Sequence, residues 1–212
     1  YLSCRNVSFI SGHVPYGFAK NESSGARFVS VIREPLERTV SALNFSMLKG
    51  GVGLKKAVRD DESLDDIDPS DIVLRVANDR AIGKFWKNVA TRFLSGFHPR
   101  FCDDDVQFLE LATANANACD NSILLNESFE EDSRVYCDHF EWFEGPDPQQ
   151  VGKGENLHVA SESDRPLKKF KKLSTKNDFS EKALATLITM NSSDLRLYES
   201  LSSKSAVERI CK

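Results

Sequence analysis

The stretch FVSVIREPLERTVS, residues 28–41, places an arginine and a serine where they could bind an anion. Arg33 follows an apolar run of high β-propensity, and Pro35 suits the first turn of a helix. Unpaired amide groups at a helix N-terminus attract anions, and an arginine adds a planar set of donors that suits a phosphate. Ser41 lies about one and a half turns into the predicted helix, so its hydroxyl could donate to the same anion. The alternative is a solvated arginine at a strand end and an ordinary helical serine.

His13 is a second residue that could do chemistry, as a base. It comes after the short apolar run VSFIS, residues 7–11, and directly after Gly12. A histidine with a pKa near about 6.5 can take the proton of an attacking hydroxyl as the new bond forms. The alternative is a turn histidine that bonds to the backbone beside a flexible glycine.

Strands and helices must position these side chains. Residues 7–11 and 28–32 are typical of strands, and the second run is apolar almost throughout, as expected when both faces of a strand are covered. The helix that Pro35 begins is expected to end at Gly50. Its buried face is predicted to consist of Leu36, Val40, Leu43 and Met47.

The second half of the chain continues the alternation. The patterns predict a helix from Ser70 or Asp71 towards a stop at Gly96, a helix over 106–116 and a strand over 122–126. They also predict a helix that runs from an S-x-x-E capping box at Ser128 and Glu131 to Phe143, and a helical region from Ser180. The acidic residues 59–71 and the partly basic residues 145–180 predict loops. Strands separated by helices predict a single α/β domain over 1–212, with a parallel central sheet flanked by helices.

Several segments give the chain a resemblance to carbohydrate sulfotransferases. FVSVIREPLERTVSALNF resembles their 3′-phosphate-binding segment, in which a strand ends in R-[DE]-P-x-x-R-x-x-S and enters a helix. SFISGHVPYGF is similar to the segment of uronosyl and heparan sulfate 2-O-sulfotransferases in which a Gly-His pair follows a strand. Weaker similarities continue in order through NVATRFLSG, SILLNESFEEDSRVYCDHFEWF, LHVASESDRP and SSDLRLYESL. The resemblance is specific over residues 12–45.

This resemblance implies a P-loop-NTPase-like sulfotransferase fold. It also implies transfer of a sulfuryl group from 3′-phosphoadenosine 5′-phosphosulfate (PAPS) to a hydroxyl of a glycan or polysaccharide. Arg33 and Ser41 would then bind the 3′-phosphate of this donor cosubstrate, and His13 would be the general base. Such in-line transfer depends mainly on positioning and charge stabilisation.

One element of the family pattern is missing. The family's strand–loop–helix, whose lysine contacts the 5′-phosphosulfate, should precede His13, and no G-x-x-x-x-G-K-[ST] occurs in the chain. We expect the natural protein either to extend upstream of Tyr1 or to lack half of the donor site, and we favour the first.

Further basic residues are candidates for binding the acceptor: Arg92, Arg165, Lys168 and Lys169. The basic segment RPLKKFKKLSTK, residues 165–176, corresponds in position to a family loop that approaches donor and acceptor; the alternative is a solvated loop. Arg92 could face an acceptor carboxylate, or it could complement the C-terminal dipole of its helix. The scattered histidines and cysteines show no metal-ligand spacing, and the family needs no metal, so we predict no metal site.

Composition limits the partners. A net charge of −4 argues against nucleic acid as a partner, and no apolar run is long enough to span a membrane. We expect membrane contact only through an N-terminal anchor outside this chain, and the oligomeric state is left open.

The five cysteines allow two disulfides and a free thiol, or five thiols. Five N-x-[ST] sequons favour the Golgi lumen or another part of the secretory pathway. They begin at Asn6, Asn21, Asn44, Asn126 and Asn191.

Two other classes of function compete with the enzyme. A sulfotransferase-like domain without the P-loop element could be a non-catalytic structural or carbohydrate-binding subunit of a larger assembly. A small kinase is disfavoured, because the sequence has neither a Walker-type lysine nor a magnesium-binding carboxylate pattern.

Overall fold

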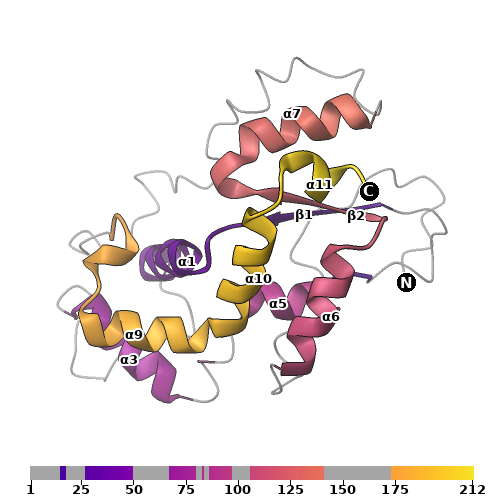
Figure 1. Cartoon of the computed structure of the whole chain (residues 1–212). Coiled ribbons are helices and arrows are strands. Elements are labelled where there is room, and N and C mark those ends of the chain that lie inside the picture. The colour runs from indigo at the N-terminus through magenta and orange to yellow at the C-terminus, as the bar shows by residue number, and fades with distance from the viewer. Residues whose placement is uncertain are drawn as a thin grey trace.

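The computed structural model describes residues 15–17, 27–49, 67–79, 83, 86–96, 106–140 and 173–212. Over these residues the chain is a mixed α/β fold with more helix than strand, and helices flank a two-stranded sheet (Figure 1). The strands are β1 (Phe28–Ile32) and β2 (Asn121–Leu125). The α-helices are α1 (Pro35–Lys49), α3 (Pro69–Asn78), α5 (Val89–Leu94), α6 (Val106–Ala116), α7 (Phe129–His139), α9 (Glu181–Met190), α10 (Ser192–Ser202) and α11 (Ala206–Ile210). Two 3-10 turns are η1 (Asn126–Ser128) and η3 (Lys176–Asp178).

The two strands run parallel, as the alternation of strands and helices predicts. Their register pairs Phe28 with Asn121 and continues to Ile32 with Leu125. Paired residues of parallel strands face the same side of the sheet, so the register fixes which side chains each covering helix can meet.

One face of the sheet is covered by α5, α6 and α10. Ile32 from β1 and Ile123 from β2 pack there with buried residues of these helices. The helical members of this cluster are Leu94, Ala112, Ala116, Leu197 and Leu201. Figure 1 shows the three helices together on the side of the sheet opposite to α7. Small alanines on α6 allow close approach of this helix to the strands.

On the other face, the helices that the structure describes cover β2 but leave β1 partly exposed. Leu124 packs with Tyr136 and Phe140 at α7 and with Ile210 of α11. Val29 and Val31 lie on the same face of β1, but they are 43% and 55% exposed. The prediction that both faces of the 28–32 strand are covered is therefore wrong, because α7 and α11 lie against β2.

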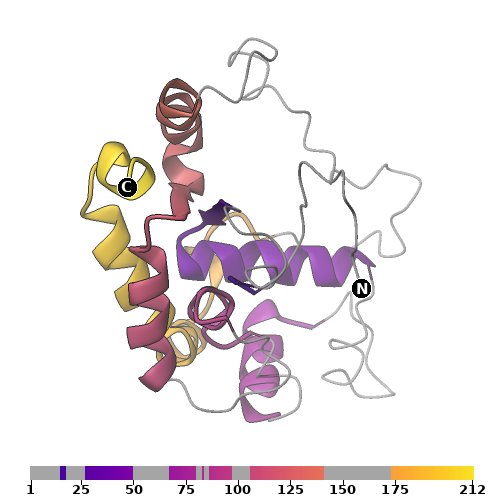
Figure 2. The same ribbon diagram turned by 90° about the vertical axis from the view of Figure 1, so that its right-hand side faces the viewer.

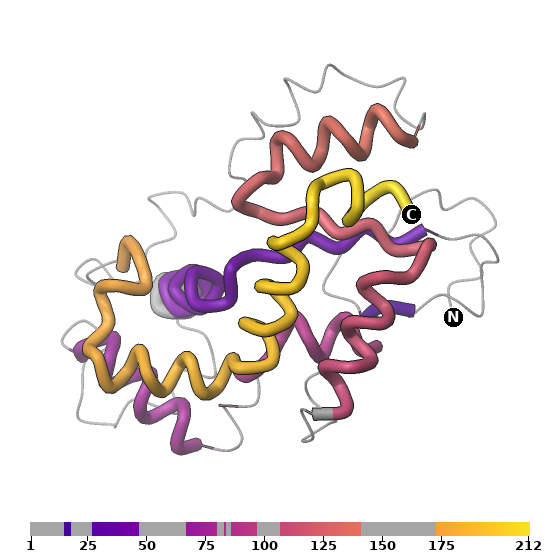
Figure 3. The backbone as a smooth tube through the Cα atoms, in the orientation of Figure 1, coloured from indigo at the N-terminus to yellow at the C-terminus, as the bar shows by residue number. Residues whose placement is uncertain are grey.

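Helix α1 packs with α3 and α9 in a separate cluster (Figure 2). Leu36, Val40 and Leu43 are buried in this cluster, which confirms these three positions of the predicted face of α1. The side chain of Met47 lies outside the part of the chain that the structure describes. Helices α9 and α10 meet at a sharp bend (Figure 3), and Asn191 is the residue between them. The predicted C-terminal helical region therefore begins after the Ser180 cap but consists of three helices.

The helix predicted from Ser70 or Asp71 towards Gly96 is not continuous: among the described residues, α3 ends at Asn78 and α5 begins at Val89. The cap of α3 is Asp68, whose carboxylate accepts from the Ser70 amide at 2.6 Å, with Pro69 in the first turn. The acidic segment 59–71 therefore ends inside a helix. Asp79, directly after α3, is extended, and Asn88, directly before α5, is left-handed at a φ of 46°. Gly96 follows α5 with a φ of 88°, which confirms the predicted stop.

Helix α7 departs from its predicted boundaries. The Ser128 side chain makes no capping hydrogen bond, so the S-x-x-E capping box does not form. Instead, the 3-10 turn η1 directly precedes α7. The helix ends at His139 rather than at Phe143. Of the predicted loop over 145–180, the structure describes residues 173–180, which include the 3-10 turn η3. The predicted strand over 7–11 lies outside the described residues.

Candidate functional site

The carboxyl ends of β1 and β2 meet at one edge of the sheet. Because Ile32 pairs with Leu125, the residues that leave the two strands there are Arg33 and Asn126. Helix α1 starts from this edge at Pro35, and η1 leads from it into α7. In open parallel sheets, ligands bind outside the carboxyl ends of the strands. This edge is the candidate functional site.

Arg33, at this edge, and Ser41, farther along α1, are both accessible to a ligand. Arg33 is half-buried and Ser41 is exposed. Neither side chain makes a hydrogen bond or ion pair with the residues that the structure describes, and the two do not bond to each other. Ser41 lies about 9 Å along the helix axis from Pro35, at about 1.5 Å per residue. It also lies on the opposite side of α1 from buried Val40 and Leu43, as the predicted apolar face requires.

Carboxylates already cap the start of α1. The Glu34 carboxylate accepts from the Glu37 amide at 2.6 Å. The Glu34 amide in turn donates to the Glu127 carboxylate at 2.9 Å. Two of the amides that an anion would use are thus bonded within the protein. The spacing of Glu34 and Glu37 around Pro35 is visible in the sequence, but the Glu127 contact depends on the strand register.

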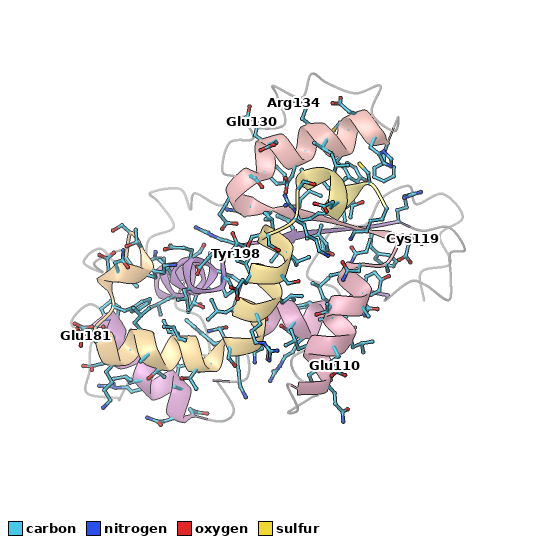
Figure 4. All side chains as sticks on the ribbon, in the orientation of Figure 1. Glu110, Cys119, Glu130, Arg134, Glu181 and Tyr198 are labelled. Atoms are coloured by element: carbon cyan, nitrogen blue, oxygen red, sulfur yellow. The ribbon has the colours of Figure 1, made fainter. Side chains whose placement is uncertain are left out.

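Glu127 also binds Tyr198 of α10. The Tyr198 hydroxyl donates to the second Glu127 oxygen at 2.9 Å. Burial, the hydrogen bond to Glu127 and the negative charges of Glu127 and Glu34 together raise the pKa of Tyr198 to about 12. Figure 4 shows Tyr198 beside the passage from β1 into α1. Tyr198 is therefore a neutral hydrogen-bond donor at physiological pH.

Lys176 brings a second cation to the start of α1. Its ammonium lies 3.1 Å from the Glu34 carboxylate, and its amide donates to Glu37 at 3.2 Å. Asn44 holds the same segment farther along α1, because its side-chain amide bonds to both the N–H and the C=O of Leu173 at 3.0 and 2.8 Å. Lys176 is the last residue of the basic segment 165–176, so the end of that segment lies along α1.

A shallow, open depression of about 570 Å³ lies beside this edge, at the start of α7. Its lining residues are Asn126, Glu127, Ser128, Phe129, Glu130, Glu131 and Arg134. Glu130 and Arg134 are exposed on α7 (Figure 4), with 3.8 Å between their charged groups. Three carboxylates against one guanidinium disfavour a phosphate in this depression. A neutral, hydroxyl-rich group fits its charge better.

Arg38, the second arginine of the R-[DE]-P-x-x-R-x-x-S pattern, bonds to residues of other parts of the protein. Its guanidinium donates to the Trp86 carbonyl at 3.3 Å and to the Asn191 side chain at 3.1 Å, and it lies 3.8 Å from the Asp194 carboxylate. Burial lowers the pKa of Arg38, and the charge of Asp194 opposes this effect. Arg38 therefore ties α1 to α10.

Arg92 is almost completely buried, with 1% of its surface exposed. It lies in the last turn of α5, where a positive charge complements the helix dipole. A polysaccharide chain could not reach it without opening this part of the fold. The burial favours the structural interpretation of Arg92 over acceptor binding.

The other predicted site residues lie outside the described ranges: His13, Arg165, Lys168 and Lys169. Their roles stay predictions. The structure describes residues 15–17, which follow His13 closely in the sequence; there the Tyr16 hydroxyl donates to Asp120 at 2.5 Å and the Tyr16 amide donates to the Phe93 carbonyl at 2.8 Å.

Two of the three described sequon asparagines are buried. Asn44 is held by Leu173, and Asn191 bonds to both the Leu187 carbonyl and Arg38. Asn126 is exposed at the carboxyl edge of the sheet. Within the described ranges, Cys119, Cys137 and Cys211 are free thiols. Burial raises the pKa of the Cys211 thiol. Assignment to the secretory pathway stays a prediction.

The residues that the structure describes contain no group of three or more His, Cys, Asp or Glu side chains placed to hold a metal ion. None of the described helices has both the length and the apolarity needed to cross a bilayer. Protein-family models, curated proteins and solved structures gave no match to this chain.

Proposed function

We propose that the chain is a P-loop-like sulfotransferase domain that transfers a sulfuryl group from PAPS to a hydroxyl of a glycan or polysaccharide. One observation carries the proposal. A half-buried guanidinium at the carboxyl end of β1 and an exposed hydroxyl in the following helix, Arg33 and Ser41, have no protein partner among the described residues. A parallel strand beside β1 and a helix directly after it agree with this type of fold.

Arg33 and Ser41 hold the 3′-phosphate of the donor in this proposal. The guanidinium gives a bidentate, charge-assisted contact, and the Ser41 hydroxyl adds a neutral hydrogen bond. Lys176 supplies further positive charge on the same side of α1, where it offsets Glu34. The donor is thereby positioned with its sulfuryl group towards the acceptor.

In the transfer step, the acceptor oxygen forms a bond to sulfur as the bond from sulfur to the 5′-phosphate oxygen breaks. The acceptor hydroxyl gives its proton to His13, and the departing phosphate oxygen keeps the electron pair as adenosine 3′,5′-bisphosphate. No oxidant and no metal is needed for this balance. His13 acts by raising the nucleophilicity of the hydroxyl, and most of the remaining effect comes from positioning.

The alternative is a non-catalytic subunit that binds carbohydrate. The carboxylates of Glu34, Glu37 and Glu127 at the start of α1 favour it, because they repel a phosphate there. The open depression at α7 suits a neutral sugar. In that case the chain binds an oligosaccharide but not the nucleotide.

Calorimetry with adenosine 3′,5′-bisphosphate and adenosine 5′-phosphate distinguishes the two functions. The enzyme should bind the bisphosphate more tightly, and Arg33→Ala should weaken that binding about tenfold to a hundredfold, since a charge-assisted hydrogen bond contributes about 1.5–3 kcal/mol. Ser41→Ala should weaken it by less. Binding of the 5′-phosphate should not change. Arg196→Ala, at an exposed position on α10, is the matched control.

A separate assay tests His13. His13→Ala should abolish sulfate transfer to a glycan acceptor while binding of the bisphosphate persists. Equal affinity for the two nucleotides in the wild-type chain would contradict the Arg33 assignment, and loss of both binding and transfer in His13→Ala would indicate a structural histidine.

A further inference from the structure

Glu127 joins three elements at the edge where the donor would bind. One carboxylate oxygen accepts the Glu34 amide at the entry to α1, and the other accepts the Tyr198 hydroxyl of α10, each at 2.9 Å. Glu127 itself belongs to η1, directly after β2. Its side chain is exposed apart from these two bonds, and it lines the open depression.

The bonded groups are those that an anionic ligand uses. An amide at the entry to a helix donates to phosphates in many nucleotide sites, and here it donates to a carboxylate. Glu34 cannot compensate the negative charge of the Glu127 carboxylate, because Glu34 is itself an acidic residue paired with Lys176. Arg33 is the adjacent cation without a protein partner among the described residues, and the Glu127 carboxylate is bonded to the amide of Glu34, the residue that follows Arg33.

We infer that Glu127 is an internal competitor of the donor nucleotide: its carboxylate occupies the entry to α1 and weakens phosphate binding at Arg33. This inference rests on the proposed function, because it concerns the affinity of that same site. Tyr198 holds the competitor in place by donating to its second oxygen. Glu127 is a positioning residue that sets donor affinity, and it takes no part in the transfer of the sulfuryl group.

The direction of the effect separates this role from a structural one. Loss of a structural cap would loosen the start of α1 and weaken nucleotide binding. Loss of a competing charge should strengthen it. Unit charges within several ångströms of each other at a partly exposed site interact strongly enough to change a dissociation constant about threefold to thirtyfold. The change should shrink as ionic strength rises, because salt screens exposed charges.

The experiment measures the dissociation constant of adenosine 3′,5′-bisphosphate by calorimetry at low and high salt. Glu127→Gln keeps an acceptor oxygen and removes the charge, so its dissociation constant should fall about threefold or more at low salt. Glu127→Lys should lower it further, although lysine cannot accept either hydrogen bond. Glu110→Gln, the same chemical change at an exposed position on α6 (Figure 4), should leave it within about twofold.

The outcomes are distinct. Unchanged or weaker binding in both Glu127 variants, with tight binding in the wild-type chain, overturns the competitor role and leaves the proposed function standing. No binding to the wild-type chain and to either variant overturns both. Because Glu127 is exposed, both variants should fold, which circular dichroism and a thermal unfolding curve verify.

Discussion

Asn88 and Asp194 cap each other's helices. The Asn88 side-chain oxygen accepts from the amides of Ser193 and Asp194 at the start of α10, at 3.1 and 3.2 Å. The Asp194 carboxylate accepts from the amides of Ala90 and Thr91 at the start of α5, at 3.1 and 2.7 Å. Both capping residues are buried, so neither set of amides can turn to water instead.

Asn88→Ala should therefore lower the free energy of unfolding by about 2–4 kcal/mol. Two buried amides lose their acceptor, and alanine must adopt the left-handed conformation of Asn88. Asn88→Gly should cost about 1 kcal/mol less, because glycine adopts that conformation freely. Urea unfolding measures both, with Asn78→Ala on the exposed end of α3 as control. Equal losses for alanine and glycine would contradict the backbone part of the argument.

The buried ion pair of Asp132 and Arg209 should be essential for packing α7 and α11 on β2. The guanidinium donates to both carboxylate oxygens at 2.6 and 2.8 Å, and the carboxylate also accepts from the Leu125 amide at 2.7 Å. Asp132→Asn leaves a buried positive charge without its counter-ion, so it should cost about 3–5 kcal/mol in urea unfolding.

The matched control for this pair is Glu130→Gln, which removes an exposed carboxylate 3.8 Å from Arg134 on the same helix. It should change stability by less than about 1 kcal/mol. A loss in Asp132→Asn as small as that of the control would show that the buried pair contributes little.

Tyr198 should make the stability of the fold fall at alkaline pH. Its folded pKa of about 12 lies above the value of about 10 in an unfolded chain, so the folded state keeps the proton longer. This contribution is complete below about pH 10 and is lost as the pH rises through about 12. Urea unfolding at a series of alkaline pH values should show a steeper fall for the wild-type chain than for Tyr198→Phe. Parallel curves would argue against the raised pKa.

Lys176 should support donor binding by neutralising Glu34. Lys176→Gln should weaken binding of adenosine 3′,5′-bisphosphate about threefold to tenfold at low salt, because an unpaired carboxylate then remains near Arg33. Lys182→Gln, at an exposed position on α9, provides the control in the same calorimetric titration. If the two variants bind alike, Lys176 has no role at the site.

Local patterns predicted the segments that carry the candidate site. The apolar run 28–32, Pro35 and the spacing of Leu36, Val40 and Leu43 specify β1 and α1, because a strand and an amphipathic helix each require only their own residues. The availability of Arg33 and Ser41 also agrees with that local pattern.

Long-range partners explain what the sequence pattern missed. The break before α5 depends on Asn88, whose left-handed backbone is stabilised by bonding to residues of α10 that lie far along the chain. The cap of α1 by Glu127 requires the register of β1 on β2. The partial exposure of Val29 and Val31 reflects which strand the helices cover, and no pattern within 28–32 reports that.

The enclosed positions of Asn44 and Asn191 have a consequence for biosynthesis. An oligosaccharide joined to the Asn44 amide during translation would leave no room for the Leu173 backbone, to which this amide is hydrogen-bonded. One joined to Asn191 would displace the Arg38 guanidinium. In any compartment with an oligosaccharyltransferase, glycosylation would therefore compete with folding. Only nascent chains that pack these helices before the oligosaccharide is attached would reach the native state.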